Sequence, residues 1–228
     1  TYTGSQFIYS GTAAFVSGAG SVMATTSNAN LDANFTGSAT FTLGGDVNAS
    51  SPASTFFTPS VTPNGSVQLN MAAGTSFSDG GNTITVTNHF GADGVKASYN
   101  LTGTLVMAAP SGSTRIQNNS TSLGMCVADL NNLTIATTGT AGNVIVQPLA
   151  GNNTLTVKGN LTLAGTATGS KLQPNANTIE LKGNFNDTRT VDMISAGTST
   201  FLFNGGAAQT FTTGYASGES FSNVVLNN

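Results

Sequence analysis

The sequence predicts an all-β protein folded as a parallel β-helix (β-solenoid) with coils of about 22–24 residues. Three observations support this prediction. Thr, Val and Phe are plentiful, whereas the helix formers Glu, Lys, Arg and Gln are scarce. Apolar and polar residues alternate in short runs, as in strands with one buried face. A nine-residue motif also recurs in the second half of the chain.

The recurring motif defines the coil. Residues 153–161 (NTLTVKGNL) match residues 177–185 (NTIELKGNF) position by position, at a spacing of about 24 residues. Looser copies make five visible coils and occur at residues 132–135, 200–205 and 223–227. A unit this small cannot bury its own apolar face, so it must stack on its neighbours in parallel register. We expect Gly159 and Gly183 to mark the bends between strands.

Stacking places equivalent residues above one another at a spacing of about 4.8 Å. We expect Thr154 above Thr178 and Asn160 above Asn184, with side-chain hydrogen bonds forming ladders between coils. The apolar residues that recur on the inward face are expected to form the core: Phe41, Leu155, Val157, Ile179, Leu181, Phe201, Phe203 and Phe211.

The chain divides by regularity into two parts. Residues 1–120 form an irregular, β-rich region that we expect to continue the solenoid, and residues 121–228 carry the regular repeats. Pro52, Pro59 and Pro63 remove ladder donors, so residues 50–65 are expected to leave the coil as a loop or to mark a break. Residues 110–120 are the other candidate boundary.

Composition limits the class of protein. Charged residues make up 7 % of the chain and the net charge is -3, so solvation comes from hydroxyl and amide groups. The six basic residues are scattered, which argues against nucleic acid as a partner. No apolar run is long enough to span a membrane. We expect an exported, extracellular protein, read as a processed mature chain or a segment of a longer one.

Few residues offer chemistry. The lone Cys126 is interpreted as a buried structural thiol, and the lone His89 as a turn residue without a second metal ligand. Asp79 and Asp93 are interpreted as turn residues rather than calcium ligands. We therefore predict no catalytic residue, no cofactor site and no metal site, and hence no enzyme activity.

One weak charged patch stands out. It falls within a single coil and consists of Glu180, Lys182, Asp187 and Arg189, with Asp192 close behind. Parallel β-helices also carry polysaccharide lyases and hydrolases, which need paired carboxylates or a cluster of acids and bases. We interpret the patch mainly as a solvated group of ion pairs.

Both ends of the chain alternate like strands and carry no recognisable cap. An open strand edge is a template for pairing with another chain. We therefore predict an end-to-end interface that includes Phe7 and Tyr9 near one end and Val224, Val225 and Leu226 near the other.

A family resemblance rests on three segments of the regular part. Residues 157–163 (VKGNLTL), 203–211 (FNGGAAQTF) and 221–227 (FSNVVLN) resemble repeats of large secreted bacterial surface proteins of the adhesin-like and autotransporter-like β-solenoid type. The resemblance covers about the last 100 residues. It implies a parallel β-helix, export, and a role in adhesion or in an extracellular fibre.

These observations predict a structural subunit or segment of a cell-surface filament, which self-associates into a homopolymer. Surface glycans and other cell-surface proteins are further candidate partners. The alternative is a carbohydrate-binding or carbohydrate-active β-helix protein, an adhesin or a lyase-like enzyme. A third interpretation keeps the fibre but replaces the solenoid by a sandwich whose strand near residues 7–15 inserts into a neighbour.

Overall fold

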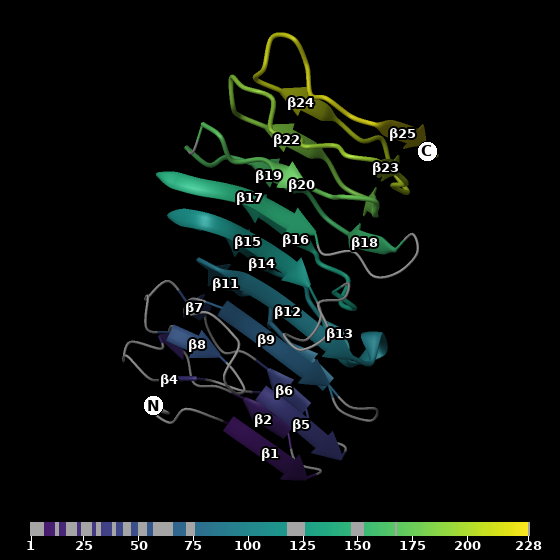
Figure 1. Cartoon of the computed structure of the whole chain (residues 1–228). Helices are drawn as coiled ribbons and strands as arrows, with labels where there is room; N and C mark the ends of the chain where they lie inside the picture. The colour runs from purple at the N-terminus through teal and green to yellow at the C-terminus, as the bar shows by residue number, and fades with distance from the viewer. Residues whose placement is uncertain are drawn as a thin grey trace.

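The computed structural model confirms the predicted fold: parallel strands stack into a β-solenoid, with the two ends of the chain at opposite ends of the stack (Figure 1). The structure describes residues 76–117, 126–146, 153–166 and 168–227, and before them the backbone of strands β1 to β9 with the side chains of Val67 and Leu69. Within these residues, helix is limited to the short 3-10 helix η1 (Lys96–Ser98).

The strands form four sheets, and every strand pair is parallel. Sheet A has nine strands: β1 (Phe7–Gly11), β4 (Ala29–Asn30), β5 (Ala33–Gly37), β8 (Ser54–Phe56), β9 (Ser66–Met71), β12 (His89–Gly94), β15 (Ser111–Gln117), β17 (Thr140–Val146) and β20 (Leu172–Gln173). Sheet B has four: β2 (Ala14–Val16), β6 (Thr40–Thr42), β10 (Ser76–Ser78) and β13 (Tyr99–Asn100).

The other two sheets complete the coil. Sheet C has eight strands: β3 (Val22–Met23), β7 (Val47–Ala49), β11 (Thr83–Val86), β14 (Thr104–Met107), β16 (Asn132–Ile135), β19 (Leu161–Leu163), β22 (Phe185–Asp187) and β24 (Phe211–Thr213). Sheet D has four: β18 (Thr154–Val157), β21 (Thr178–Leu181), β23 (Thr200–Phe203) and β25 (Asn223–Leu226).

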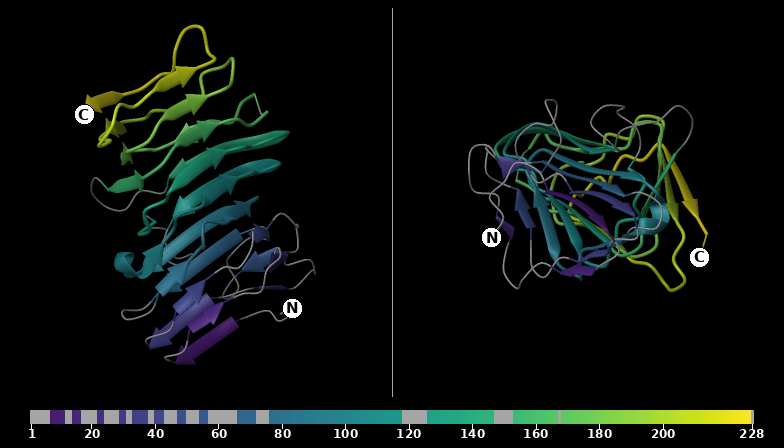
Figure 2. Two further views of the ribbon diagram at one scale, coloured as in Figure 1. Left: turned by 180° about the vertical axis from the view of Figure 1, so that it is seen from behind. Right: turned by 90° about the horizontal axis from the view of Figure 1, so that it is seen from below.

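Along each coil the chain passes through three faces of the solenoid in a fixed order. In the first half the chain passes from sheet A to B to C, as in β9, β10 and β11; in the second half it passes from A to D to C, as in β17, β18 and β19. Sheets B and D therefore occupy the same face. Leu130 continues this face between them, because it forms a parallel bridge with Val157 of β18. Figure 2 shows the stack from behind and along its axis.

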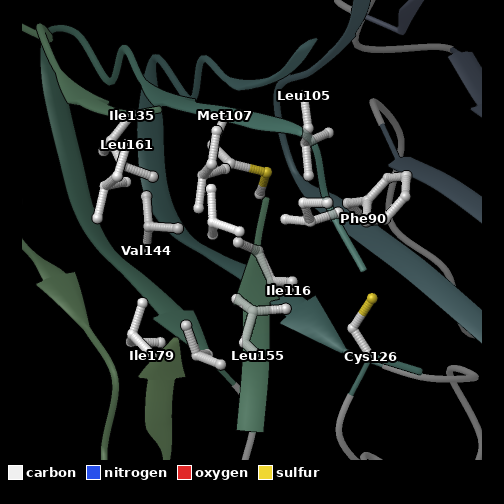
Figure 3. Packing of buried hydrophobic residues seen from close by; sticks show 14 of the residues in the cluster. Phe90, Leu105, Met107, Ile116, Cys126, Ile135, Val144, Leu155, Leu161 and Ile179 are labelled. Carbon is white, nitrogen blue, oxygen red and sulfur yellow. The ribbon is translucent and has the colours of Figure 1, made fainter. Parts of the chain in front are cut away.

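The period-2 pattern places the apolar residues of sheets C and D on the inner face of each sheet. Strands β11, β14, β16, β21 and β23 all alternate partly exposed and buried residues. Register keeps the columns aligned, since Leu133 pairs with Leu161 and Leu161 pairs with Phe185. These side chains meet in one continuous core between the faces (Figure 3). The core thus runs along the stack, and each coil buries its apolar face against its neighbours.

The predicted coil length of 22–24 residues holds on sheet D, whereas the spacing on sheet C varies more widely. On sheet D, Thr154 pairs with Thr178, Thr178 with Thr200 and Thr200 with Asn223, at spacings of 24, 22 and 23 residues. On sheet C, the spacing is 21 residues from Thr83 to Thr104, 28 from Leu133 to Leu161 and 24 from Leu161 to Phe185. The strands keep their register while the connections between them vary, because a connecting segment can lengthen outside the stack without disturbing the ladder.

An asparagine ladder runs up the corner before sheet C. Asn132 Oδ1 accepts from the backbone N–H of Asn160 at 2.9 Å, Asn160 Oδ1 accepts from Asn184 N–H at 2.9 Å, and Asn184 Oδ1 accepts from Thr210 N–H at 2.8 Å. The predicted alignment of Asn160 with Asn184 is therefore confirmed, and so is that of Thr154 with Thr178. These hydrogen bonds differ from the expected bonds between side chains, since each side-chain amide oxygen accepts from a backbone N–H of the next coil.

The same corner requires glycine. The Gly183 N–H donates to Gly159 O at 3.0 Å, and a Cβ atom on Gly183 would lie 2.3 Å from that oxygen. Successive coils approach too closely here for any side chain. Gly159 and Gly183 thus lie at the bends between strands, as predicted.

Three residue-level expectations were wrong. Asp93 lies in strand β12 rather than in a turn. Phe211 faces the core and stacks on Phe185, but it is 46 % exposed because it belongs to the last coil of sheet C. His89 does not lie in a turn: it is the first residue of β12 and is buried next to Phe90. The other predicted core residues are buried, apart from Phe41, whose side chain lies outside the described residues.

Candidate functional site

The predicted charged patch divides between two faces of the solenoid. Glu180 and Lys182 belong to the β21 side of the coil, on sheet D, whereas Asp187 and Arg189 follow on the sheet C side with β22. Lys182 Nζ lies 3.6 Å from Glu180 Oε1. The patch therefore does not form a single constellation.

Glu180 is part of a polar ladder across sheet D. Its Oε2 accepts from Thr156 Oγ1 at 2.9 Å and its Oε1 accepts from Asn204 Nδ2 at 2.8 Å. Burial opposes ionisation, but these two hydrogen bonds and the Lys182 charge outweigh it and lower the pKa of Glu180. Both carboxylate oxygens are engaged in joining coils, which indicates a structural role.

Asp187 meets a residue that the sequence did not single out. Asp187 is 1 % exposed, and its Oδ1 accepts from the Arg189 backbone N–H at 2.8 Å. Its Oδ2 is buried, with no N–H or hydroxyl donor among the described residues. The carboxyl group of Glu219, from the segment between β24 and β25, lies next to the Asp187 carboxyl, because it accepts from Thr213, the residue that pairs with Asp187.

Glu219 joins three parts of the last two coils. Its Oε2 accepts from the backbone N–H of Met193 at 2.7 Å, and its Oε1 accepts from Thr213 Oγ1 at 3.2 Å. The neighbouring Asp192 is also close enough to share a hydrogen bond with it. We call Asp187, Asp192 and Glu219 the carboxyl cluster.

Asp192 is the ionised member of the carboxyl cluster. Lys171 Nζ lies 2.9 Å from its Oδ2, and the backbone N–H groups of Ile194 and Ser220 donate to its Oδ1 at 3.2 Å. Burial opposes ionisation, but these donors outweigh it and lower the pKa of Asp192 to about 2. Asp192 thus carries a negative charge next to Glu219 at neutral pH.

Glu219 has the opposite behaviour. Burial, together with the hydrogen bond to Asp187 and the charges of the neighbouring carboxylates, raises its pKa to about 8, and the Met193 N–H opposes this only in part. Glu219 is therefore mainly protonated at neutral pH.

This geometry does not suit glycoside hydrolysis. The two carboxyl groups of such enzymes stand about 5–9.5 Å apart, on either side of a bound sugar. Here the carboxyl groups of Glu219 and Asp187 lie next to each other, and Asp187 is buried. Among the described residues, no group of three or more His, Cys, Asp and Glu side chains is arranged to hold a metal ion.

The second candidate site is the open end formed by β24 and β25, which close sheets C and D in the described part of the chain. Val224 pairs with Phe201 and Leu226 pairs with Phe203, so both side chains occupy the inward-facing column. Phe201 is 0 % exposed, whereas Val224 is 48 % and Leu226 is 75 % exposed. Core positions are thus uncovered in the last coil. Val225 pairs with Leu202 on the outward column.

Aromatic rings complete this end face. Phe211 stacks on Phe185 with ring centroids 4.6 Å apart and planes 8° apart. Phe221 packs edge-on against Phe201 and Phe211, at 4.8 and 5.8 Å. We call Phe211, Val224 and Leu226 the end face. The sequence pointed to the last strand, but not to Phe211, which was expected in the core.

The opposite end is described by its backbone. Strand β1, which contains Phe7 and Tyr9, is the terminal strand of sheet A, and β2 and β3 are terminal in sheets B and C. Phe7 pairs with Ala33 and Tyr9 with Phe35. The side chains of Phe7 and Tyr9 lie outside the described residues, so their part in an interface stays a prediction.

The remaining candidates have structural surroundings. Burial raises the pKa of the Cys126 thiol to about 12, consistent with a buried, unreactive cysteine. The Asp79 carboxylate accepts from the backbone N–H groups of Gly81, Thr102 and Gly103, so it joins two coils. A pocket beside it, lined by residues such as Leu101 and Leu130, has a volume of only about 10 Å³, far less than a typical ligand site.

Comparison with protein-family models, with curated proteins and with solved structures found no match for this chain. Over the part that the structure describes, no helix has the length and apolar character needed to cross a membrane. The solenoid and its end face are therefore the features of this chain that bear on its function.

Proposed function

We propose that this chain is a structural segment of an extracellular cell-surface fibre, in which copies stack end to end. The observation that supports this most is the end face, where the inward-facing Val224 and Leu226 lie uncovered beside two open strand edges. An open parallel edge pairs with another strand, and exposed core residues favour an apolar cover. The occupant that we propose is the first coil of a second copy.

The two ends can be joined on one face. A second copy continues the face of sheet D if its β2 lies along β25, because sheets B and D occupy the same face. All pairs within the stack are parallel, and this arrangement keeps the new pair parallel as well. Such a head-to-tail contact uses different surfaces on the two copies, so it does not close on itself and extends into a filament.

The energetics favour assembly that depends on concentration. Burying one Val, Leu or Phe side chain fully contributes about 1.5–3 kcal/mol. Association costs about 4–15 kcal/mol in lost freedom. The end face alone therefore does not drive tight binding, and backbone hydrogen bonds along β24 and β25 must add to it. We expect growth above a threshold concentration rather than permanent dimers.

The low charge and the family resemblance support the extracellular part of the proposal. Solenoid repeats of adhesin-like proteins resemble residues 157–163, 203–211 and 221–227, and a surface solvated by amides and hydroxyls allows long, closely spaced assemblies. We propose no catalytic role, because Glu180 is hydrogen-bonded between coils and Asp187 is buried. The carbohydrate-active alternative therefore has less support. Cell-surface glycans stay candidate partners of the fibre.

The test measures assembly directly. Sedimentation velocity and negative-stain electron microscopy of the purified chain over a concentration series should show fibres that lengthen with concentration. Val224→Asp places a carboxylate on the end face and should abolish growth, whereas Val225→Asp changes the outward column of the same strand and should leave it. Circular dichroism verifies that both variants keep the wild-type β spectrum. A wild-type chain that stays monomeric throughout, or equal growth of both variants, would overturn the proposal.

A further inference from the structure

The last coil is attached to the stack through acids rather than through apolar contacts alone. The segment between β24 and β25 contains Glu219 and Ser220, and it lies over the segment that contains Asp192 and Met193. Four hydrogen bonds join or brace these segments: Met193 N–H and Thr213 Oγ1 to Glu219, and Ser220 N–H and Ile194 N–H to Asp192. This is the segment that leads into β25.

We propose that Glu219 is a proton-operated clasp that holds the last coil on the stack. In the closed state, protonated Glu219 donates to the Asp187 carboxylate, which is buried and has no other donor for Oδ2 among the described residues. Opening the clasp moves the Glu219 carboxyl into water, where it ionises as an ordinary glutamate. Closing therefore takes up a proton, and opening releases one.

The charges around Glu219 determine the direction of the response. Asp187 faces it from β22 and Asp192 from the segment below, and Lys171 neutralises Asp192 rather than Glu219. An ionised Glu219 thus meets the carboxyl groups of Asp187 and Asp192, with Arg189 two residues after Asp187. The folded pKa near 8 exceeds the ordinary value of 4.5, so the clasp is strongest below about pH 4.5 and weakens as the pH rises to about 8. Above that pH no further change is expected from this group.

The response of Asp192 has the opposite sign and lies in a different range. Its pKa is lowered to about 2 from 3.8, so its contribution is present above pH 3.8 and is lost as the pH falls towards 2. Measurements between pH 5 and 8 therefore report on Glu219. The inference does not depend on filament formation, since the clasp joins two coils of one chain.

Hydrogen exchange tests the clasp in the intact chain. After correction for intrinsic exchange rates, the opening equilibrium constant measured at the amides of residues 214–227 should rise by up to about tenfold per pH unit between pH 5 and 8. This is the slope expected when opening releases one proton. Residues 154–163, in the middle of the stack, serve as the internal reference and should show no such slope. Glu219→Gln keeps a carbonyl for Met193 and an amide donor for Asp187, and should remove the slope.

Carbon-13 NMR gives a second readout that does not require the variant to fold. The chain contains two glutamates, Glu180 and Glu219, so glutamate labelled at the carboxyl carbon yields two signals. One should titrate near pH 8 and the other below its ordinary range. The clasp is rejected if both signals titrate near or below pH 4.5, or if residues 214–227 show the same pH dependence as residues 154–163.

Discussion

Asn160 binds the next coil through its side chain: its Oδ1 accepts a hydrogen bond of 2.9 Å from the backbone N–H of Asn184. Asn184 in turn accepts from Thr210 at 2.8 Å. The ladder fixes the vertical alignment of successive corners. Because the amide oxygen takes the place of a strand carbonyl, the backbone stays hydrogen-bonded where the chain turns from sheet D to sheet C.

Removing one step of this ladder should weaken the stack. Asn160→Ala leaves the Asn184 N–H without its protein acceptor, at a site where water can replace it, so we expect a loss of about 1 kcal/mol in the free energy of unfolding. Chemical denaturation measures this loss. Asn186→Ala is the matched control, since the Asn186 side chain faces outward from β22 and has no hydrogen bond among those found in the described residues. Equal losses in the two variants would contradict the ladder.

The corner glycine should be irreplaceable. A Cβ on Gly183 would lie 2.3 Å from Gly159 O, so the backbones of two coils would have to separate. We expect Gly183→Ala to lower the free energy of unfolding by about 1–3 kcal/mol. In Gly206→Ala the new Cβ meets nothing within 4 Å, and the unfolding midpoint should change little. A Gly183→Ala protein as stable as Gly206→Ala would refute the close approach.

The position of a phenylalanine in the stack should determine how much stability is lost when its ring is removed. Phe185 is 0 % exposed between neighbouring coils, whereas Phe211, stacked on it, is 46 % exposed. Phe185→Ala should cost about 3–5 kcal/mol because it leaves a cavity. Phe211→Ala should cost clearly less in monomeric protein, since solvent already reaches that ring. Thermal unfolding at low concentration, below the threshold for assembly, measures both. The reverse order would show that Phe211 is covered.

His89 should stay neutral well into the acid range. Burial, with the charge of Arg115 on the paired strand, lowers its pKa to about 4 from 6.5, and the Asn88 hydrogen bond opposes this in part. Because the pKa of His89 is lower in the folded state than in the unfolded state, its contribution to the free energy of unfolding is fully present above pH 6.5. This contribution is lost as the pH falls towards 4. The chain has one histidine, so its imidazole NMR signal can be followed without assignment. A folded-state midpoint near 6.5 would contradict the burial of this ring, and urea-unfolded protein provides the reference.

The sequence by itself determined the coil, the core columns and the bends. These features are local: alternation sets which face of a strand is buried, and the repeat of residues 153–161 at 177–185 sets which residues stack. Glu180 and Asp187 belong to one repeat, but consecutive strands of a coil lie on different faces of the solenoid. Their closeness in sequence does not show that the chain turns from one face to the next between them. The predicted patch was therefore divided when the chain folded.

Only the tertiary structure decided the contacts of Glu219 and the exposure of Phe211. Glu219 lies in a connection with no repeat pattern, and it reaches Asp187 because the coil returns to the same side one level higher. Phe211 has the pattern of a core residue, but β24 is the terminal strand of sheet C in the described part of the chain. The apolar residues of each coil are covered by the coils on either side, so their exposure depends on the position of the coil in the whole solenoid. The exposure of Phe211 could therefore not be predicted from any single repeat.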